Sequence, residues 1–164
     1  MTSMWPAKTE QRVDDEARED LVLRPLTVAD EHQALQAHEE LARDGFDFLL
    51  DLRDGDSWDE YLQRLECYRR GLDLPDGYVP ATFLVADVRG ELVGRVSIRH
   101  ELNAWLAEVG GHIGYGVRPA FRRRGYATEI LRQSLAVARE VGVVRALVTC
   151  DDGNVGSATV IERC

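Results

Sequence analysis

The chain has 164 residues, of which 45% are apolar and 30% charged, and its formal net charge is −9. These values are typical of one globular domain with a single hydrophobic core, and they exclude a disordered chain. No run approaches the roughly 18 consecutive apolar residues of a membrane span, and the polar N-terminus lacks the apolar stretch of a secretory signal. We therefore expect a cytoplasmic protein. The acidic balance argues against nucleic acids and anionic membranes as partners, because phosphate binding needs clustered cations.

The cysteines and histidines do not predict a metal site. The three cysteines and four histidines have neither a zinc spacing nor a disulfide pattern, so we expect no metal. Cys150 ends an apolar segment and is expected to be buried and inert.

The first half of the domain is predicted to hold one strand and two helices. Residues 1–20 are polar without an apolar period, which predicts a flexible arm ahead of a single domain over residues 21–164. Residues 21–26 read as a strand, and Asp30 can cap a helix that ends near residue 43. Ser57 and Glu60 have capping-box spacing and predict a second helix to about residue 70.

The second half alternates strands with helices. Residues 82–88 and 91–99 predict a β-hairpin, in which Gly94 indicates a bulge or a close backbone approach. A strand at 112–117, a helix at about 125–141, a strand at 145–150 and a last helix follow. This order predicts an α/β fold whose mixed sheet combines an antiparallel meander with one β-α-β crossover and carries helices on both faces.

The segment with the clearest chemistry is VRPAFRRRGYAT, residues 117–128. A strand runs through a basic loop into a helix start, and such a start presents unpaired N–H groups and a positive dipole to an anion. Gly125 lets a phosphate approach the backbone closely. The P-loop pattern is absent, and the dinucleotide fingerprint fails at Pro119. What remains is Arg122-x-x-Gly125-x-Ala127, whose other interpretation is a solvated helix entry.

This motif resembles the pyrophosphate-binding motif of the GNAT acetyltransferase superfamily. The context agrees, because a Gly-Tyr-x-Val-x-Pro strand end precedes it and an Asn-x-x-Ser helix start follows at Asn154 and Ser157. The similarity covers residues 82–164 and extends to residue 21.

The resemblance implies acetyl-CoA as cosubstrate. Its pantetheine arm would run between the strands at 112–117 and 145–150, held by backbone groups near Val117, and Asn154 would contact the arm near the acceptor. Asn154 could also be a plain helix cap. The implied pyrophosphate site consists of the backbone amides and nearby side chains of Arg122, Arg123, Arg124, Gly125, Tyr126, Ala127 and Thr128.

The resemblance also implies an N-acetyltransferase in which a primary amine attacks the thioester directly, while a backbone N–H near Val117 stabilises the oxyanion. His112 is a candidate general base, or else a hydrogen-bonded strand histidine. Glu108 and Glu101 are alternative bases. Many relatives carry a Tyr as general acid where this chain has Ile161, so that role stays unassigned.

The resemblance implies that the acceptor side lies near residues 39–60. An anionic rim there would attract a cationic amine, either a small molecule or a peptide, and the alternative interpretation of these charges is a solvated helical face. The acidic residues are Glu39, Glu40, Asp44, Asp47, Asp51, Asp54, Asp56, Asp59 and Glu60.

The family continues into further strands beyond the position of Cys164, so we expect a domain truncated at its C-terminus. A strand at 145–150 would then have an exposed edge, which a homodimer partner or further residues could cover. These departures keep a second function open, a non-catalytic acyl-CoA-binding module or sensor.

Overall fold

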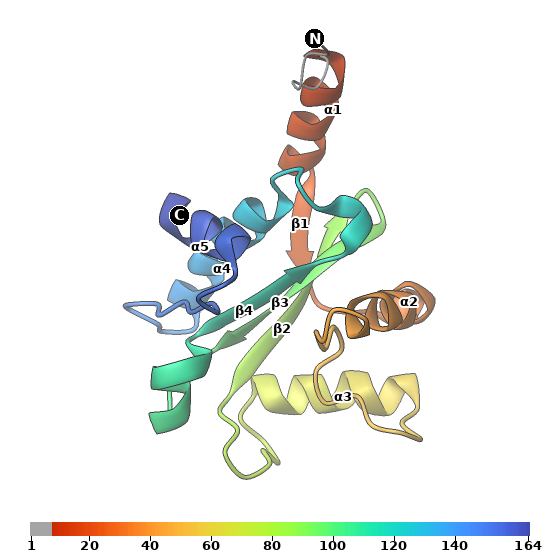
Figure 1. Ribbon diagram of the computed structural model, residues 1–164. Coiled ribbons are helices and arrows are strands. Elements are labelled where there is room, and N and C mark those ends of the chain that lie inside the picture. Colours follow the sequence, from red (N-terminus) through yellow and green to blue (C-terminus); the bar gives the residue numbers. More distant parts are fainter. Residues whose placement is uncertain (1–7) are drawn as a thin grey trace.

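The computed structural model describes residues 8–164 (Figure 1). Its centre is one antiparallel sheet of four strands in the order β1-β2-β3-β4. The strands are β1 Leu21–Arg24, β2 Ala81–Val88, β3 Glu91–Arg99 and β4 Ile113–Val117. The predicted α/β class and antiparallel meander are confirmed.

Helices cover both faces of this sheet, as expected. Helices α2 (Glu31–Ala42) and α3 (Trp58–Arg69) lie on one face, and α4 (Tyr126–Glu140) and α5 (Val155–Arg163) lie on the other (Figure 1). Each face has its own cluster of buried apolar side chains. Short helical turns occupy Val28–Asp30, Leu106–Gly110 and Pro119–Phe121.

Local signals placed these elements well. Ser57 caps α3, because its hydroxyl accepts from the Glu60 amide and its own N–H donates to the Glu60 carboxylate. The predicted irregularity near Gly94 is a β-bulge: Ala86 pairs with Gly94 while Asp87 pairs with Leu92, so Val93 is an extra residue. A Cβ on Gly94 would lie 2.5 Å from the carbonyl oxygen of Gly116, which confirms the close approach.

The N-terminal segment differs from the expected arm. Residues Lys8–Glu19 form helix α1, whose last turn reaches the domain, where Ala17 packs against the core. Because the contact between α1 and the domain is small, the sequence of α1 needs no apolar stripe, and such a stripe is the pattern that would have predicted the helix. The flexibility of the segment stays a prediction, and residues 1–7 lie outside the described part.

The strand expected at 145–150 is not formed, and with it the β-α-β crossover and the parallel pair of a mixed sheet are absent from residues 8–164. The segment meets β4 only at its start, where the His112 N–H donates to the Leu147 carbonyl at 2.7 Å. The Leu147 N–H donates to Nδ1 of His112 at 2.9 Å, and the Thr149 hydroxyl donates to the Val109 carbonyl. The side chains of His112 and Thr149 therefore bond to backbone groups that would otherwise be available for a β-ladder between β4 and this segment.

Arg118 connects the two halves of the chain. Its side chain is only 8% exposed, and it donates from Nε and Nη2 to the Glu40 carboxylate of α2, at 2.9 and 2.8 Å. Nη1 donates to the Leu92 carbonyl of β3. This ion pair fixes the loop after β4 to α2 and lowers the pKa of Glu40.

We predict that Glu40→Gln lowers the free energy of unfolding at pH 7 by about 2 kcal/mol, because it leaves a buried guanidinium without its carboxylate. The lowered pKa means that the wild-type stabilisation is present above the unfolded pKa and is lost as the pH falls through the folded one. The free energies of unfolding of the two proteins, measured with urea, should thus converge once the pH falls below the folded pKa of Glu40. The control is Glu66→Gln, which removes an exposed ion pair with Arg69 and should change the free energy of unfolding little. Equal stability of the Glu40 variant at pH 7 would contradict the prediction.

Candidate functional site

The loop between β4 and α4 has the backbone of an anion-binding turn. Arg123 and Gly125 have φ angles of 66° and 82°, in the left-handed region. Gly125 is the N-cap of α4, and the first intrahelical bond runs from the Glu129 N–H to the Gly125 carbonyl. The amides of the first turn consequently have no helical acceptor. Such strained loops with unpaired amides are typical of ligand sites.

The structure brings the predicted phosphate-binding residues together at this helix start. Tyr126 is buried and packs edge-on against Phe121 with ring centroids 6.5 Å apart, which anchors the turn. Ala127 and Thr128 are half-buried in the same turn.

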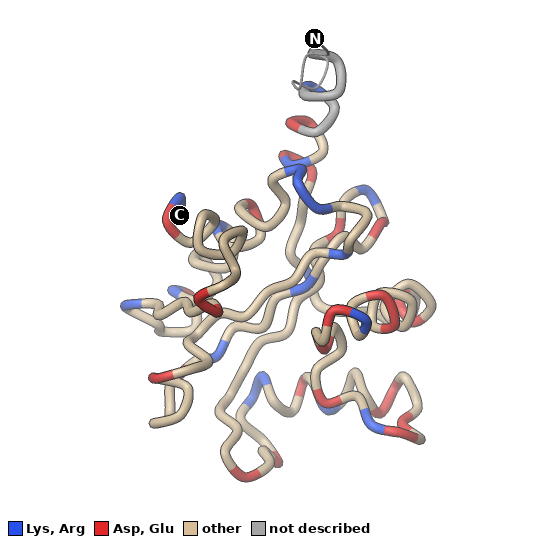
Figure 2. The backbone as a smooth tube through the Cα atoms, viewed as in Figure 1, with Lys and Arg blue, Asp and Glu red and all other residues tan. Residues whose placement is uncertain are grey.

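The three arginines have different environments. Arg122 turns back toward β4, where Nε donates to the Val117 carbonyl at 3.1 Å and Nη2 contacts the Asp44 carboxylate at 2.8 Å. Arg123 and Arg124 are exposed, and no carboxylate among the described side chains pairs with them. Figure 2 shows this basic segment beside the lower end of α1. Arg122 therefore supports the loop, while the other two arginines can face an anion.

The outer edge of β4 is open. The Arg118 N–H donates to the Val93 carbonyl, so by antiparallel alternation the backbone groups of Tyr115 and Val117 point away from β3. The Val117 carbonyl confirms this direction, since it accepts from Arg122. Within residues 8–164, no backbone hydrogen bond joins residues 113–117 to residues 145–150. An extended polar chain could pair with this edge.

The face of β4 that α4 and α5 cover contains a buried hydroxyl. The Tyr115 hydroxyl lies near Ser157 without a hydrogen-bond partner in the described structure, and burial raises its pKa. The Asn154 side chain accepts from the Ser157 N–H at 3.0 Å, so Asn154 is the N-cap of α5. Its predicted contact with a ligand remains compatible with that role.

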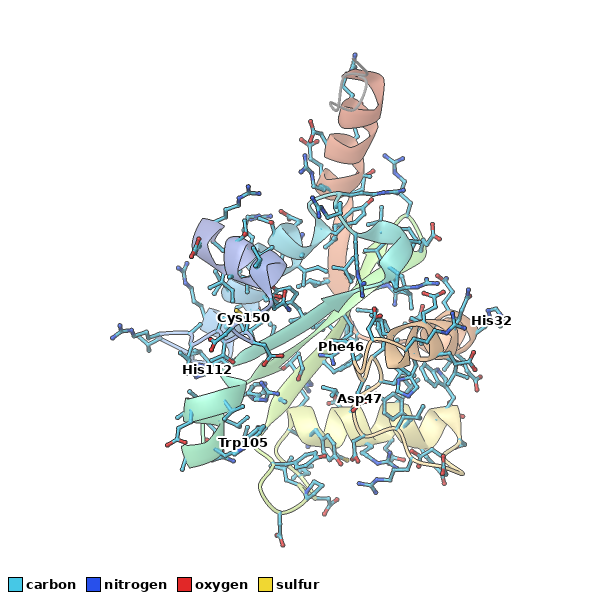
Figure 3. All side chains as sticks on the ribbon, in the orientation of Figure 1. His32, Phe46, Asp47, Trp105, His112 and Cys150 are labelled. Carbon is cyan, nitrogen blue, oxygen red and sulfur yellow. The ribbon has the colours of Figure 1, made fainter. Side chains whose placement is uncertain are left out.

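His112 lies where β4 begins (Figure 3). Because Nδ1 accepts from the Leu147 N–H, the neutral ring carries its proton on Nε2 and has no free lone pair. Burial, followed by the charge of Arg99, lowers its pKa. The geometry thus favours the hydrogen-bonded strand histidine, and a base role would require breaking this bond. Glu108 and Glu101 are both exposed.

One further expectation needs correction. Cys150 is exposed, because the segment that carries it does not enter the sheet as a buried strand. In the acidic rim, five of the nine carboxylates take part in hydrogen bonds or ion pairs. Its engaged members are Glu40, Asp44, Asp51, Asp56 and Glu60.

Sequence reasoning missed Arg95, the residue that holds the loop following α2. Its side chain is buried under this loop, and it donates to the carbonyls of Asp47 and Phe48. Phe46 lies over Gly116, where an added Cβ would come within 2.5 Å of the ring. Figure 3 shows Phe46 and Asp47 on the sheet face that α2 and α3 cover. An arginine in an alternating strand is typical of a solvent-facing position, so no sequence pattern indicates this buried role.

A strand that runs through a basic loop into a glycine-containing helix start is the arrangement that the sequence motif predicted. The model of the acetyltransferase (GNAT) domain family matches residues 20–164. The chain belongs to the GNAT acetyltransferase family. It is accordingly an acyltransferase domain.

Solved GNAT structures share the fold at low sequence identity. RimJ from Mycobacterium smegmatis, in complex with CoA-disulfide, is 18% identical with a TM-score of 0.59, and the match covers 87% of this chain and 68% of that one. A putative ribosomal-protein-serine acetyltransferase from Vibrio cholerae is 23% identical with a TM-score of 0.53, covering 89% and 79%. Glucosamine-6-phosphate N-acetyltransferase from Arabidopsis thaliana is 17% identical with a TM-score of 0.56, covering 85% and 89%. None of the curated protein sequences compared with the chain matches it.

None of the helices within residues 8–164 of this GNAT domain is both long and apolar enough to cross a membrane.

We predict that His112→Ala loosens the segment at 145–150, because the Leu147 N–H loses its acceptor. The protection of the Leu147 amide against hydrogen exchange should fall, and the free energy of unfolding should drop by about 1 kcal/mol. The pKa of His112 is lower in the folded state than in the unfolded state. The contribution of His112 to the free energy of unfolding is therefore present above its unfolded pKa and is lost as the pH falls through its folded pKa. His32→Ala, at an exposed position on α2, is the control. Unchanged protection in the His112 variant would refute the structural role.

Proposed function

We propose that this GNAT domain transfers an acetyl group from acetyl-CoA to a primary amine, by direct attack in a ternary complex. One observation carries the proposal: the left-handed turn at Gly125, with its unpaired amides, adjoins the open edge of β4 at Tyr115 and Val117. The order of these two features matches CoA, in which a pyrophosphate is followed by an amide-containing arm.

The residues fit that cosubstrate. The amides and side chains of residues 123–128 would hold the pyrophosphate, because the helix dipole and the exposed Arg123 and Arg124 favour an anion there. The outward backbone groups of Tyr115 and Val117 would pair with the amides of the pantetheine arm. The unsatisfied Tyr115 hydroxyl offers a further polar contact. The RimJ structure contains a CoA-disulfide, and a RimL structure contains coenzyme A, which supports the choice of CoA.

The chain's part in the reaction is positioning and charge stabilisation. Acetyl-CoA supplies an acyl thioester that an amine can attack without an acyl-enzyme. The Val117 N–H points to the open edge, where it could stabilise negative charge on the carbonyl oxygen. The amine must lose a proton, and the engaged lone pair of His112 leaves this step to exposed Glu108, Glu101 or water.

The acceptor would approach from the face covered by α2 and α3, across Phe46 and Asp47. The rim members Glu39, Asp47, Asp54 and Asp59 form no ion pair within the described part, and their charges favour a cationic amine, either a small molecule or a peptide. Named neighbours include an aminoglycoside acetyltransferase in complex with sisomicin and a ribosomal L7/L12 alpha-N-protein acetyltransferase.

One observation favours a second candidate, a non-catalytic acyl-CoA-binding module. Ile161 packs against the core of the α4 and α5 face and provides no hydroxyl for the leaving thiolate.

A homodimer that covers residues 145–164 also belongs to the proposal, supported by the exposed apolar side chains of Val144, Leu147 and Val155.

CoA should raise the melting temperature of the wild-type domain, because a ligand that binds only the folded state stabilises it. We predict that Gly125→Asp abolishes this shift, since it adds bulk and negative charge at the pyrophosphate site. Gly142→Asp is the matched control: Gly142 also has a positive φ, lies past the other end of α4 and has open space around it. A full shift in the Gly125 variant would place the phosphates elsewhere.

Catalysis itself is tested by thiol release from acetyl-CoA with a panel of primary amines. We expect amine-dependent release, whereas binding without release on any amine would favour the sensor. If His112 were the base, His112→Ala would lower turnover by about 10²–10⁴-fold with CoA affinity kept. Because its lone pair is engaged, we expect a fall smaller than about tenfold. Glu108→Gln, measured alongside, reports on the alternative base.

A further inference from the structure

Helix α1 touches the phosphate-binding loop. The side chain of Arg18, in the last turn of α1, lies directly on Gly125: a Cβ added to Gly125 would be 2.7 Å from Cδ of Arg18 and closer still to Nη1. Figure 2 shows the end of α1 beside the basic loop. A residue from outside the strand and helix motif therefore enters the cofactor site, and Gly125 is needed for this contact as well as for its left-handed turn.

A cavity of about 680 Å³ opens at the contact. It lies between the end of α1, the first turns of α4 and the end of α5, and its volume is that of a small-molecule site. Gly125 and Thr128 both line it, so it is continuous with the proposed pyrophosphate site. The basic side chains in its wall are Arg18, Arg132 and Arg163.

The charges at the loop end of this cavity favour an anion. Arg18 lies on Gly125 at a helix N-terminus that is itself positive, and the exposed Arg123 and Arg124 directly precede Gly125 in the chain. Arg18 pairs with Asp15 one turn earlier, and this ion pair is partly exposed on both sides and therefore weak. Glu129 is engaged by Arg132 and Gln133. Glu19 is the remaining acid in the wall, and it is exposed.

We propose that Arg18 is a ligand of the CoA pyrophosphate, so that α1 completes the cofactor site from outside the strand–loop–helix motif. This inference rests on the proposed function. The contact is at Gly125, where the free amides begin, and this position favours the pyrophosphate over the 3′-phosphate. A guanidinium can donate two parallel hydrogen bonds to phosphate oxygens, and exchanging Asp15 for a phosphate keeps the cation neutralised.

The test compares dissociation constants for CoA and for dephospho-CoA, which keeps the pyrophosphate and lacks the 3′-phosphate. Calorimetric titration of the full chain should show that Arg18→Ala weakens both ligands equally, by about tenfold or more. Arg12→Ala is the matched control, because Arg12 is an exposed arginine on the same helix and does not line the cavity. Far-UV circular dichroism and the ligand-free melting temperature of each variant establish that α1 and the domain are retained.

Three results would overturn the assignment. Unchanged CoA affinity in Arg18→Ala would remove Arg18 from the site. Weaker binding of CoA alone, with dephospho-CoA unaffected, would assign Arg18 to the 3′-phosphate. Tighter binding of both ligands would mean that the guanidinium obstructs the pyrophosphate position. If the wild-type chain bound neither ligand, the proposed function would fail, and the role of Arg18 with it.

Discussion

The position of the loop that follows α2 depends on one buried cation. Arg95 of β3 is 4% exposed and has no carboxylate partner among the described residues. Its guanidinium donates to the carbonyls of Asp47, Phe48 and Gly114, and it lies 4.2 Å from the centre of the Phe46 ring. Burial lowers the pKa of Arg95 to about 9, which still leaves it protonated at neutral pH. Three carbonyls and a ring face thus replace a counter-ion, and they hold the loop after α2 against β4.

The segment between β4 and α4 is joined to the end of α2 through arginines. Arg118 binds Glu40 of α2, and Arg122 binds Asp44 just beyond the helix. These two ion pairs connect the proposed phosphate loop with the segment that leads to Phe46.

The parts of this fold that could be predicted are those coded by neighbouring residues. The Ser57–Glu60 cap, the hairpin at 82–99 and the glycine start of α4 each depend on local backbone chemistry, and the structure contains all of them. The failures depend on partners distant in sequence. Nothing near residues 145–150 reveals that the His112 side chain will take the Leu147 N–H, and nothing in β3 reveals that Arg95 will find backbone carbonyls. Helix α1 was missed because, among its described side chains, only Ala17 and Arg18 are seen to attach it to the domain.

The bulge in β3 changes which face each side chain meets. Leu92 packs with the cluster under α2, Val93 with the cluster under α4, and Val96 and Ile98 again with the latter. In a regular strand, side chains two positions apart share a face, so Leu92 and Val96 would lie on the same one. The extra residue Val93 shifts the alternation by one, so Leu92 and Val96 meet opposite cores although they are four positions apart. Loss of that one residue would leave a regular strand in which Leu92 still faces α2, and the core under α4 would lose the Val93 side chain.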